Sequence, residues 1–167
     1  MNTSPVFAQM LHSSMDGFVW AVNQMHPDRY AVRPPKSLGD WSVTQHVFHI
    51  VYYERVCALP NMQHWLGGLP YDDSTYDEDA AWGANKASLD DLITQFKTVR
   101  VDQIALLPQF TPAMWQKVGD SVWGRKTPFW IVSKTWQHSI EHTNDVMRMV
   151  LFWHNFVAYE AEPINND

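Results

Sequence analysis

The chain has 167 residues, which fits a single domain, and 46% of them are hydrophobic, including 9 Trp and 8 Phe. Its net charge of −6 argues against binding to the negatively charged backbone of a nucleic acid. Its single cysteine, Cys57, cannot form an internal disulfide. No segment has the roughly 18 consecutive apolar residues of a membrane span or the pattern of a secretion signal. We therefore expect one soluble, cytoplasmic domain over residues 1–167.

The first predicted helix runs from about residue 5 to about residue 25. Ser4 and Pro5 form a helix start, with an N-cap followed by a proline in the first turn. Apolar residues then recur at helical spacing, namely Phe7, Met10, Leu11, Met15, Phe18, Val19 and Val22. Prolines and a glycine break regular structure from there up to Trp41.

The second predicted helix begins with a capping box, in which Ser42 and Gln45 can each bond the backbone N–H of the other. We expect it to end before Pro60, because proline disrupts a helix interior. Residues 61–87 lack a clean period and are rich in Gly, Asp, Pro and aromatic residues. They predict a long crossover with room for one short helix.

The third predicted helix is capped by Ser88, in the segment Ser-Leu-Asp-Asp, and runs to Pro108. Thr111 and Pro112 predict a single turn, and residues 115–126, which include two glycines, predict a loop or a small hairpin. Thr127 and Pro128 repeat the cap-plus-proline start, and apolar positions sustain a fourth helix to about residue 156.

The predicted fold is all-α: a four-helix bundle with a long crossover between the second and third helices. No strand pattern alternates for long enough to build a sheet. A ferritin-like di-iron site is not supported, because the bundle lacks paired Glu-x-x-His motifs. A Ser-His-Asp hydrolase is not supported either, because no G-x-S-x-G elbow is present.

The most informative residues are histidines. His138 and His142 are four residues apart on the fourth predicted helix, at the border of its apolar face, so both imidazoles can bind one ion. A catalytic zinc site usually has three protein ligands and an open position. The second helix offers His46, nearer the centre of its apolar stripe, and His49, at the flank. Spacing alone leaves the two about even.

The chain resembles the DinB/YfiT-like superfamily of bacterial four-helix bundles. The resemblance rests on Trp41-Ser-Val, on His49 eight residues after this tryptophan, and on the His138-x-x-x-His142 helix about ninety residues later. It spans nearly the whole chain, including the crossover. In that family one histidine after the W-[ST]-V start and the two of H-x-x-x-H bind a divalent metal, often nickel or zinc. The resemblance therefore implies a metal site at His49, His138 and His142.

The resemblance also implies a class of reaction. Family members of known activity are mostly S-transferases that use bacillithiol, mycothiol or glutathione, and others are described as metal-dependent hydrolases. The expected cofactors are thus Zn or Ni and a low-molecular-weight thiol, acting on a small-molecule substrate in a homodimer. In several members the second histidine of the pair precedes an R-G-Q-like segment, where this chain has Thr143-Asn-Asp145. The alternative hypothesis is a non-enzymatic, ligand-binding bundle with a role in stress responses.

Other residues receive simpler interpretations. Asp145 is the nearest carboxylate that could orient His142, and His46 is expected to be structural or to support the site. Cys57 falls on the apolar stripe, where packing is its expected role. His12 and Asp16 are expected at the surface. The aromatic end of the fourth helix is expected either to form a dimer interface or to close the core; it contains Phe152, Trp153 and Phe156.

Overall fold

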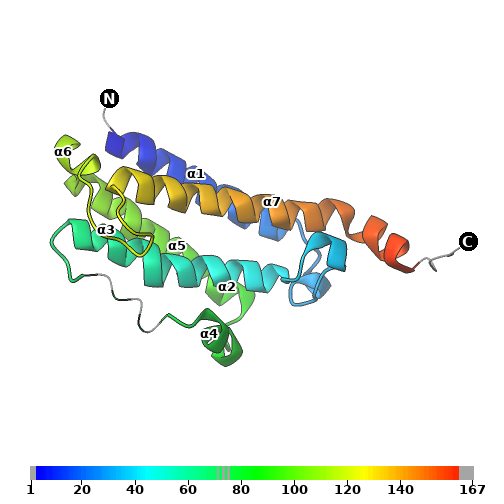
Figure 1. Cartoon of the computed structure of the whole chain (residues 1–167). Coiled ribbons are helices and arrows are strands. Elements are labelled where there is room, and N and C mark those ends of the chain that lie inside the picture. Colours follow the sequence, from blue (N-terminus) through cyan, green and yellow to red (C-terminus); the bar gives the residue numbers. More distant parts are fainter. Residues whose placement is uncertain (1–2, 71, 73, 75, 162–167) are drawn as a thin grey trace, which may run out of the picture.

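The computed structural model describes residues 3–70, 72, 74 and 76–161, and it confirms the predicted all-α four-helix bundle (Figure 1). No strand occurs in this described part of the chain. The predicted crossover positions Tyr71, Asp73 and Thr75 lie outside the described residues.

The first long helix, α1 (Thr3–Asn23), follows its apolar pattern and buries Leu11, Phe18 and Val22 completely or almost so. Two short 3-10 turns follow, η1 (Pro27–Arg29) and η2 (Lys36–Leu38), in the proline-rich segment where no regular structure was expected. The segment returns the chain to the start of α2.

The second long helix consists of three continuous parts and passes the proline at which we expected it to end. α2 (Val43–Tyr53) starts with the predicted capping box, a π-helical turn η3 (Glu54–Ala58) follows, and α3 (Leu59–Trp65) completes it. The expected end before Pro60 is therefore wrong. Proline has no N–H to donate, and it lies in the first turn of α3, directly after the widened π turn.

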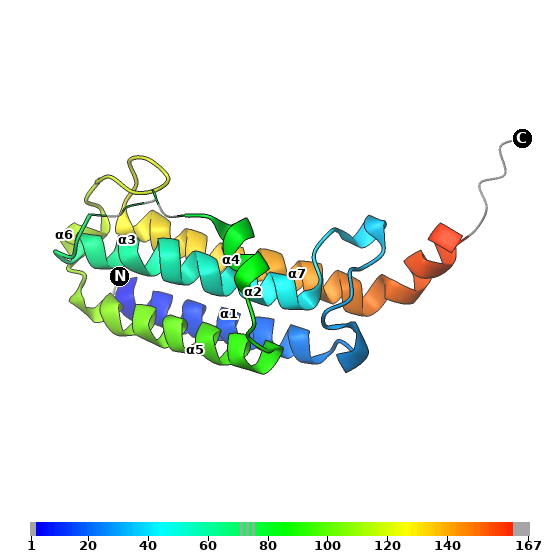
Figure 2. The ribbon, with the colours of Figure 1, turned by 90° about the horizontal axis from the view of Figure 1, so that it is seen from below.

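The crossover contains the one short helix for which we expected room, α4 (Glu78–Ala84), capped by Asp77. α5 (Leu89–Leu106) follows, with the predicted Ser88 cap. Figures 1 and 2 show that α2 and α5 run side by side in the same direction, so the chain must travel back along the bundle between them. A long connection is the physical requirement for two parallel neighbouring helices.

The last helix is the longest, α7 (Pro128–Ala161), and its end projects beyond the other helices (Figure 2). Before it lie η4 (Leu107–Gln109), the predicted single turn α6 (Pro112–Trp115), and a small hairpin-like loop closed by an antiparallel bridge between Gly119 and Lys126. α7 packs on both α1 and α2.

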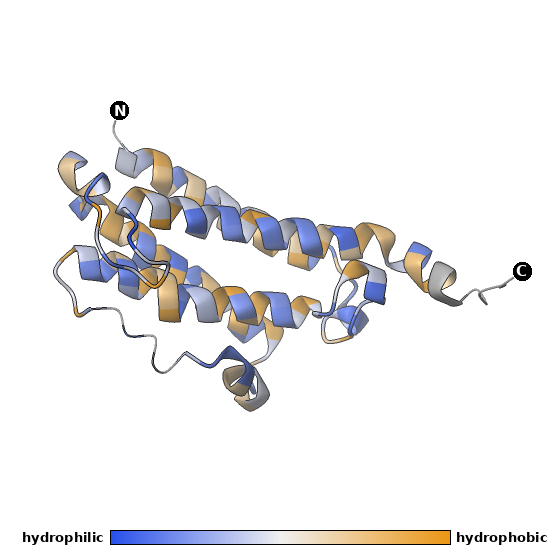
Figure 3. Cartoon of the chain, in the orientation of Figure 1, coloured by the Kyte–Doolittle hydropathy of each residue, from blue (hydrophilic) through white to orange (hydrophobic). Residues whose placement is uncertain are grey.

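Hydrophobic and hydrophilic residues alternate along the helices (Figure 3), and the buried hydrophobic ones form separate clusters rather than one continuous core. One cluster includes Phe18, Ile50 and Met149, and another includes Leu107 and Ile131. Four buried polar residues lie between them along the helices: Ser14, Glu54, Arg100 and Ser139. Each of the four comes from a different long helix, so a polar layer crosses the bundle.

Several simpler expectations can also be compared with the structure. Cys57 is buried, whereas His12 and Asp16 form an exposed pair 3.0 Å apart. At the end of α7, Trp153 is buried in the core and Phe152 is 43% exposed. Among the described residues, no helix is both long and apolar enough to cross a membrane.

Candidate metal centre

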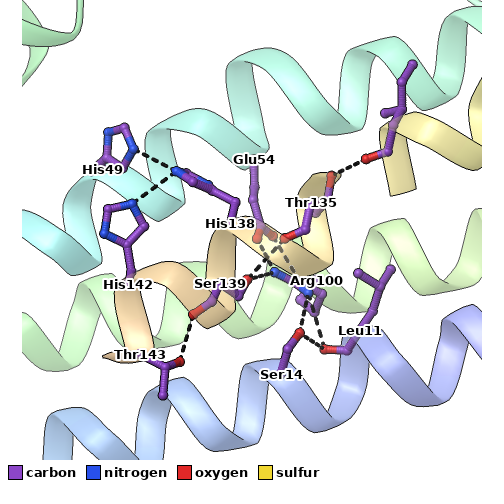
Figure 4. Close-up of polar contacts among 11 residues, drawn as sticks. Leu11, Ser14, His49, Glu54, Arg100, Thr135, His138, Ser139, His142 and Thr143 are labelled. Carbon is purple, nitrogen blue, oxygen red and sulfur yellow. Dashed lines mark hydrogen bonds and ion pairs between the residues drawn. The ribbon is translucent and has the colours of Figure 1, made fainter. Parts of the chain in front are cut away.

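Three histidine side chains point toward one another between α2 and α7 (Figure 4). The Nε2 atom of His138 lies 2.9 Å from Nε2 of His49 and 3.0 Å from Nε2 of His142. These are the three residues for which the family resemblance implied a metal site. The structure thus brings together, in one place, side chains that are up to 93 positions apart in the chain, from His49 to His142.

Local structure explains the convergence. The Ser42 capping box fixes where α2 begins, and with it the direction of His49. His138 and His142 lie one turn apart on the same face of α7, because residues at i and i+4 are stacked in a helix. α2 and α7 are neighbours in the bundle, so the two faces meet.

The spacing of the nitrogens fits a metal ion. Imidazole nitrogens bind zinc at about 2.0 to 2.1 Å, which puts two of them about 3.3 Å apart in a tetrahedral site and about 2.9 Å apart at the right angle of an octahedral site. The observed separations are 2.9 and 3.0 Å. His138 Nδ1 is buried and has no hydrogen-bond partner among the described residues. The donor set, three imidazoles with no carboxylate among them, suits a borderline ion such as zinc or nickel.

The histidines of α7 are held in their neutral form. Burial, and to a smaller extent the charge of His49, lower the pKa of His138 to about 3. Burial and the neighbouring His138 lower the pKa of His142 to about 2, and burial lowers that of His46 to about 4. Metal ligands must be deprotonated, so at neutral pH these imidazoles are ready to bind an ion without releasing a proton.

His46 does not join the Nε2 cluster but supports it. Its Nδ1 lies 2.8 Å from Nδ1 of His142, on the edge of that ring away from the cluster. When Nε2 of His142 faces an ion, its Nδ1 carries the hydrogen and donates to His46, which fixes the tautomer. Asp145, the carboxylate expected in this role, is farther away, with Oδ2 4.0 Å from the same nitrogen.

Aromatic rings cover the cluster. The Trp41 ring is nearly parallel to that of His142, with centroids 6.0 Å apart, and its centroid is 4.7 Å from that of His49. On the inner side the Tyr53 ring lies 4.2 Å from that of His138. Trp41, the tryptophan of the family motif, is 37% exposed, so it separates the histidines from solvent without sealing them.

One polar partner of the site was not found from the sequence. His49 Nδ1 lies 2.6 Å from Oε1 of Glu78, the first residue of α4. The Asp77 cap is a readable helix-start signal, but nothing in the local sequence indicates that α4 docks on α2. A cavity of about 490 Å³ borders the site at Trp41 and His46, and its charged lining residues are two basic and two acidic ones, Lys36, Arg148, Asp40 and Asp145.

The fold and the site together define the class of protein. It is a four-helix bundle with a candidate metal centre, where three histidine nitrogens converge between two helices. Residues 10–146 match the sequence model of the DinB superfamily, and the chain belongs to this family. No curated protein matches it.

A solved structure from Bacillus subtilis, YfiT, has the same fold. It is described as a probable metal-dependent hydrolase with an unusual four-helix bundle topology. It is 19% identical to this chain, with a TM-score of 0.65 over 87% of this chain and 86% of that one.

Proposed function

We propose that this protein is a metal-dependent enzyme in which His49, His138 and His142 hold one divalent ion, Zn²⁺ or Ni²⁺. The observation that carries the proposal is the convergence of three Nε2 atoms at 2.9 and 3.0 Å. The family and the description of YfiT as a probable metal-dependent hydrolase support the same class of chemistry. Three ligands leave coordination positions for an exogenous molecule.

A bound divalent ion would act as a Lewis acid that lowers the pKa of a water or thiol at its open position. The protein contributes position and environment. The neutral histidines of α7 present their lone pairs, and His46 fixes the orientation of His142. Trp41 restricts water on one side, and the cavity beside it has room for a small-molecule substrate.

The reaction follows from which molecule occupies the open position. With water the enzyme is a hydrolase, which is the reaction suggested by the description of YfiT. With a low-molecular-weight thiol of the bacillithiol, mycothiol or glutathione type, it is an S-transferase. The cavity is lined by two basic residues, Lys36 and Arg148, and by two acidic ones, Asp40 and Asp145, so it offers partners for a polar substrate or thiol of either charge. We further propose that the protein acts as a cytoplasmic homodimer.

The first experiment measures metal content. Purified wild type, His142→Ala and the control His12→Ala are compared by elemental analysis after loading with zinc or nickel and desalting. We expect about one ion per chain in wild type and in the control, whose histidine is exposed and outside the cluster, and almost none in His142→Ala. Equal metal in all three would overturn the proposed site.

The second experiment separates the reactions. Metal-loaded protein is assayed on activated esters without thiol, and on an electrophilic aromatic substrate with each thiol in turn. Turnover without thiol indicates a hydrolase, and turnover that requires one thiol indicates a transferase. In either case His142→Ala should be inactive. Metal binding without turnover of any substrate would favour the non-enzymatic alternative.

A further inference from the structure

We propose that Glu78 is a positioning residue of the metal centre. Its carboxylate accepts the Nδ1 hydrogen of His49 and thereby keeps Nε2 of this imidazole directed at the ion. The inference rests on the proposed metal site and adds to it a residue from the crossover, which no ligand pattern identifies. It gives helix α4 a function beyond connecting α2 to α5.

The contact has the geometry of a charge-assisted hydrogen bond. Oε1 of Glu78 is 2.6 Å from Nδ1 of His49, whereas Nε2 on the opposite edge of the ring faces His138. Glu78 therefore cannot bind the same ion and can only act through His49. Carboxylates that accept from a ligating imidazole fix its tautomer and raise its basicity.

The contact between Glu78 and His49 is largely shielded from solvent. The side chains of His49 and Glu78 are only 16% and 19% exposed, so solvent screens their interaction less than it would at the surface.

The neighbouring acidic residues have other roles. Asp77 is the N-cap of α4 and accepts from the backbone N–H of Ala80 at 2.9 Å. Asp79 is exposed and makes no hydrogen bond to the histidines. Of these three acidic residues, only Glu78 contacts a histidine of the candidate metal centre.

The segment that carries Glu78 is itself fixed to α2. The hydroxyl of Tyr76 donates to Oε2 of Glu78 at 2.9 Å, so both carboxylate oxygens are bound. The backbone N–H of Asp77 donates to the hydroxyl of Tyr52 at 3.0 Å, and the rings of Tyr52 and Tyr76 meet edge to face at 5.1 Å. These contacts hold the carboxylate in one place.

An apolar contact one turn later anchors the helix as well. Trp82, at i+4 from Glu78 and hence on the same face, packs on Phe48 of α2 with ring centroids 5.1 Å apart. Phe48 directly precedes His49. The carboxylate and its apolar anchor therefore dock on adjacent residues of α2, which aligns α4 with the metal ligand.

His49 needs such support more than its partners do. His138 and His142 are buried on one helix and restrain each other, and His142 is also held by His46. His49 is the most exposed of the three and is the one ligand that α2 supplies to the cluster. Without Glu78 its imidazole is free to turn away from the cluster.

The test measures zinc affinity of the metal-free full chain by competition with a chromophoric chelator. Glu78→Gln keeps an acceptor but loses the charge, and Glu78→Ala loses both. We expect affinity to fall by about tenfold in the first and by about a hundredfold in the second. Asp79→Asn, which removes the same charge from the adjacent residue, is the matched control and should stay within about twofold of wild type.

Two further measurements separate positioning from general destabilisation. The thermal unfolding midpoint of the metal-free variants should match that of Asp79→Asn, and the visible spectrum of the Co²⁺ complex should change only in the Glu78 variants. Glu78→Ala binding zinc as tightly as Asp79→Asn would overturn the inference alone. Failure of wild type to bind either zinc or nickel would overturn the proposed function and this inference with it. If Glu78→Ala does not fold, Glu78→Gln decides.

Discussion

Arg100 and Glu54 form a two-point ion pair in the interior of the bundle, and both side chains are completely shielded from solvent. The other guanidinium hydrogens bind the carbonyl of Leu11 at 3.2 Å and the hydroxyls of Ser14 and Ser139 at 3.1 and 2.7 Å (Figure 4). All five donors of Arg100 thus have acceptors. Through these contacts Arg100 links residues of all four long helices, and it does so next to the histidines, because Ser139 directly follows His138.

Removing one partner of this pair should be strongly destabilising. Arg100→Met leaves a buried carboxylate without its cation, and we expect it to lower the free energy of unfolding by about 3 to 5 kcal/mol. Replacing Glu54 by Met as well should recover much of this loss, because no buried charge remains. Urea unfolding of the two variants and of the control Arg55→Met, an exposed neighbour, measures the effect. A double variant no more stable than Arg100→Met would contradict the explanation.

The metal-free protein should lose stability as the pH falls below 6.5. His46 has a pKa of about 4 in the fold against 6.5 in an unfolded chain, so between these values the unfolded state binds a proton that the folded state does not. The free energy of unfolding therefore decreases with decreasing pH, by up to about 3 kcal/mol for this residue. In His46→Gln the decrease between pH 7 and pH 4.5 should be smaller. Urea unfolding with a chelator present tests this, and equal decreases in both proteins would contradict it.

The start of α2 should depend on its capping box. Ser42 Oγ accepts from the Gln45 N–H at 3.3 Å, and the Gln45 side chain accepts from the Ser42 N–H at 2.9 Å. Ser42→Ala should lower the free energy of unfolding by about 1 kcal/mol. In the control, Ser133→Ala, an exposed hydroxyl bonded within α7 is lost, and the change should be within about 0.5 kcal/mol. Chemical unfolding curves that place the two variants together would show that the cap is unimportant.

Cys57 should be inert in the folded protein. Its side chain is 4% exposed, and burial in apolar surroundings disfavours the reactive thiolate. A chromogenic disulfide reagent should modify it only as fast as the π turn opens, and fully once urea unfolds the chain. Since the chain has one cysteine, the absorbance reports this residue alone. Rapid stoichiometric modification without urea would refute the packing role.

Local signals explain what could be predicted. The helix starts at Ser42, Ser88 and Thr127 can be predicted because these side chains accept hydrogen bonds from backbone N–H groups of the first helical turn. The apolar period of 3.6 residues identifies the buried faces. His138 and His142 are fixed relative to each other by one helical turn. For these reasons the helix bundle and the pairing of His138 with His142 could be predicted from residue spacing. The choice of His49 over His46 required the family pattern.

Tertiary contacts explain what could not be predicted. The helical wheel placed His46 nearer the centre of the apolar stripe, and His46 is indeed buried, but burial does not determine which ring nitrogen faces the cluster. Glu78 meets His49 across 29 positions of chain through the docking of α4, which no local pattern encodes. The helix passes Pro60 because a π turn forms where Glu54 enters the polar layer.

The π turn Glu54–Ala58 also sets the angle about the helix axis at which α3 continues the helix that α2 begins. A widened turn inserts one residue, which rotates everything after it by about 100° relative to a regular helix. The buried positions of the half that carries His49 and those of the half that buries Asn61 and Met62 therefore do not follow one continuous helical period. Deleting a single residue from this turn would turn it into a regular α-helical turn and keep both faces in place, whereas a regular turn built from the same five residues would rotate the second half out of the core. The π turn thus allows the histidine side of α2 and the buried side of α3 both to face the interior, whereas a regular helix of the same residues would bury only one of them.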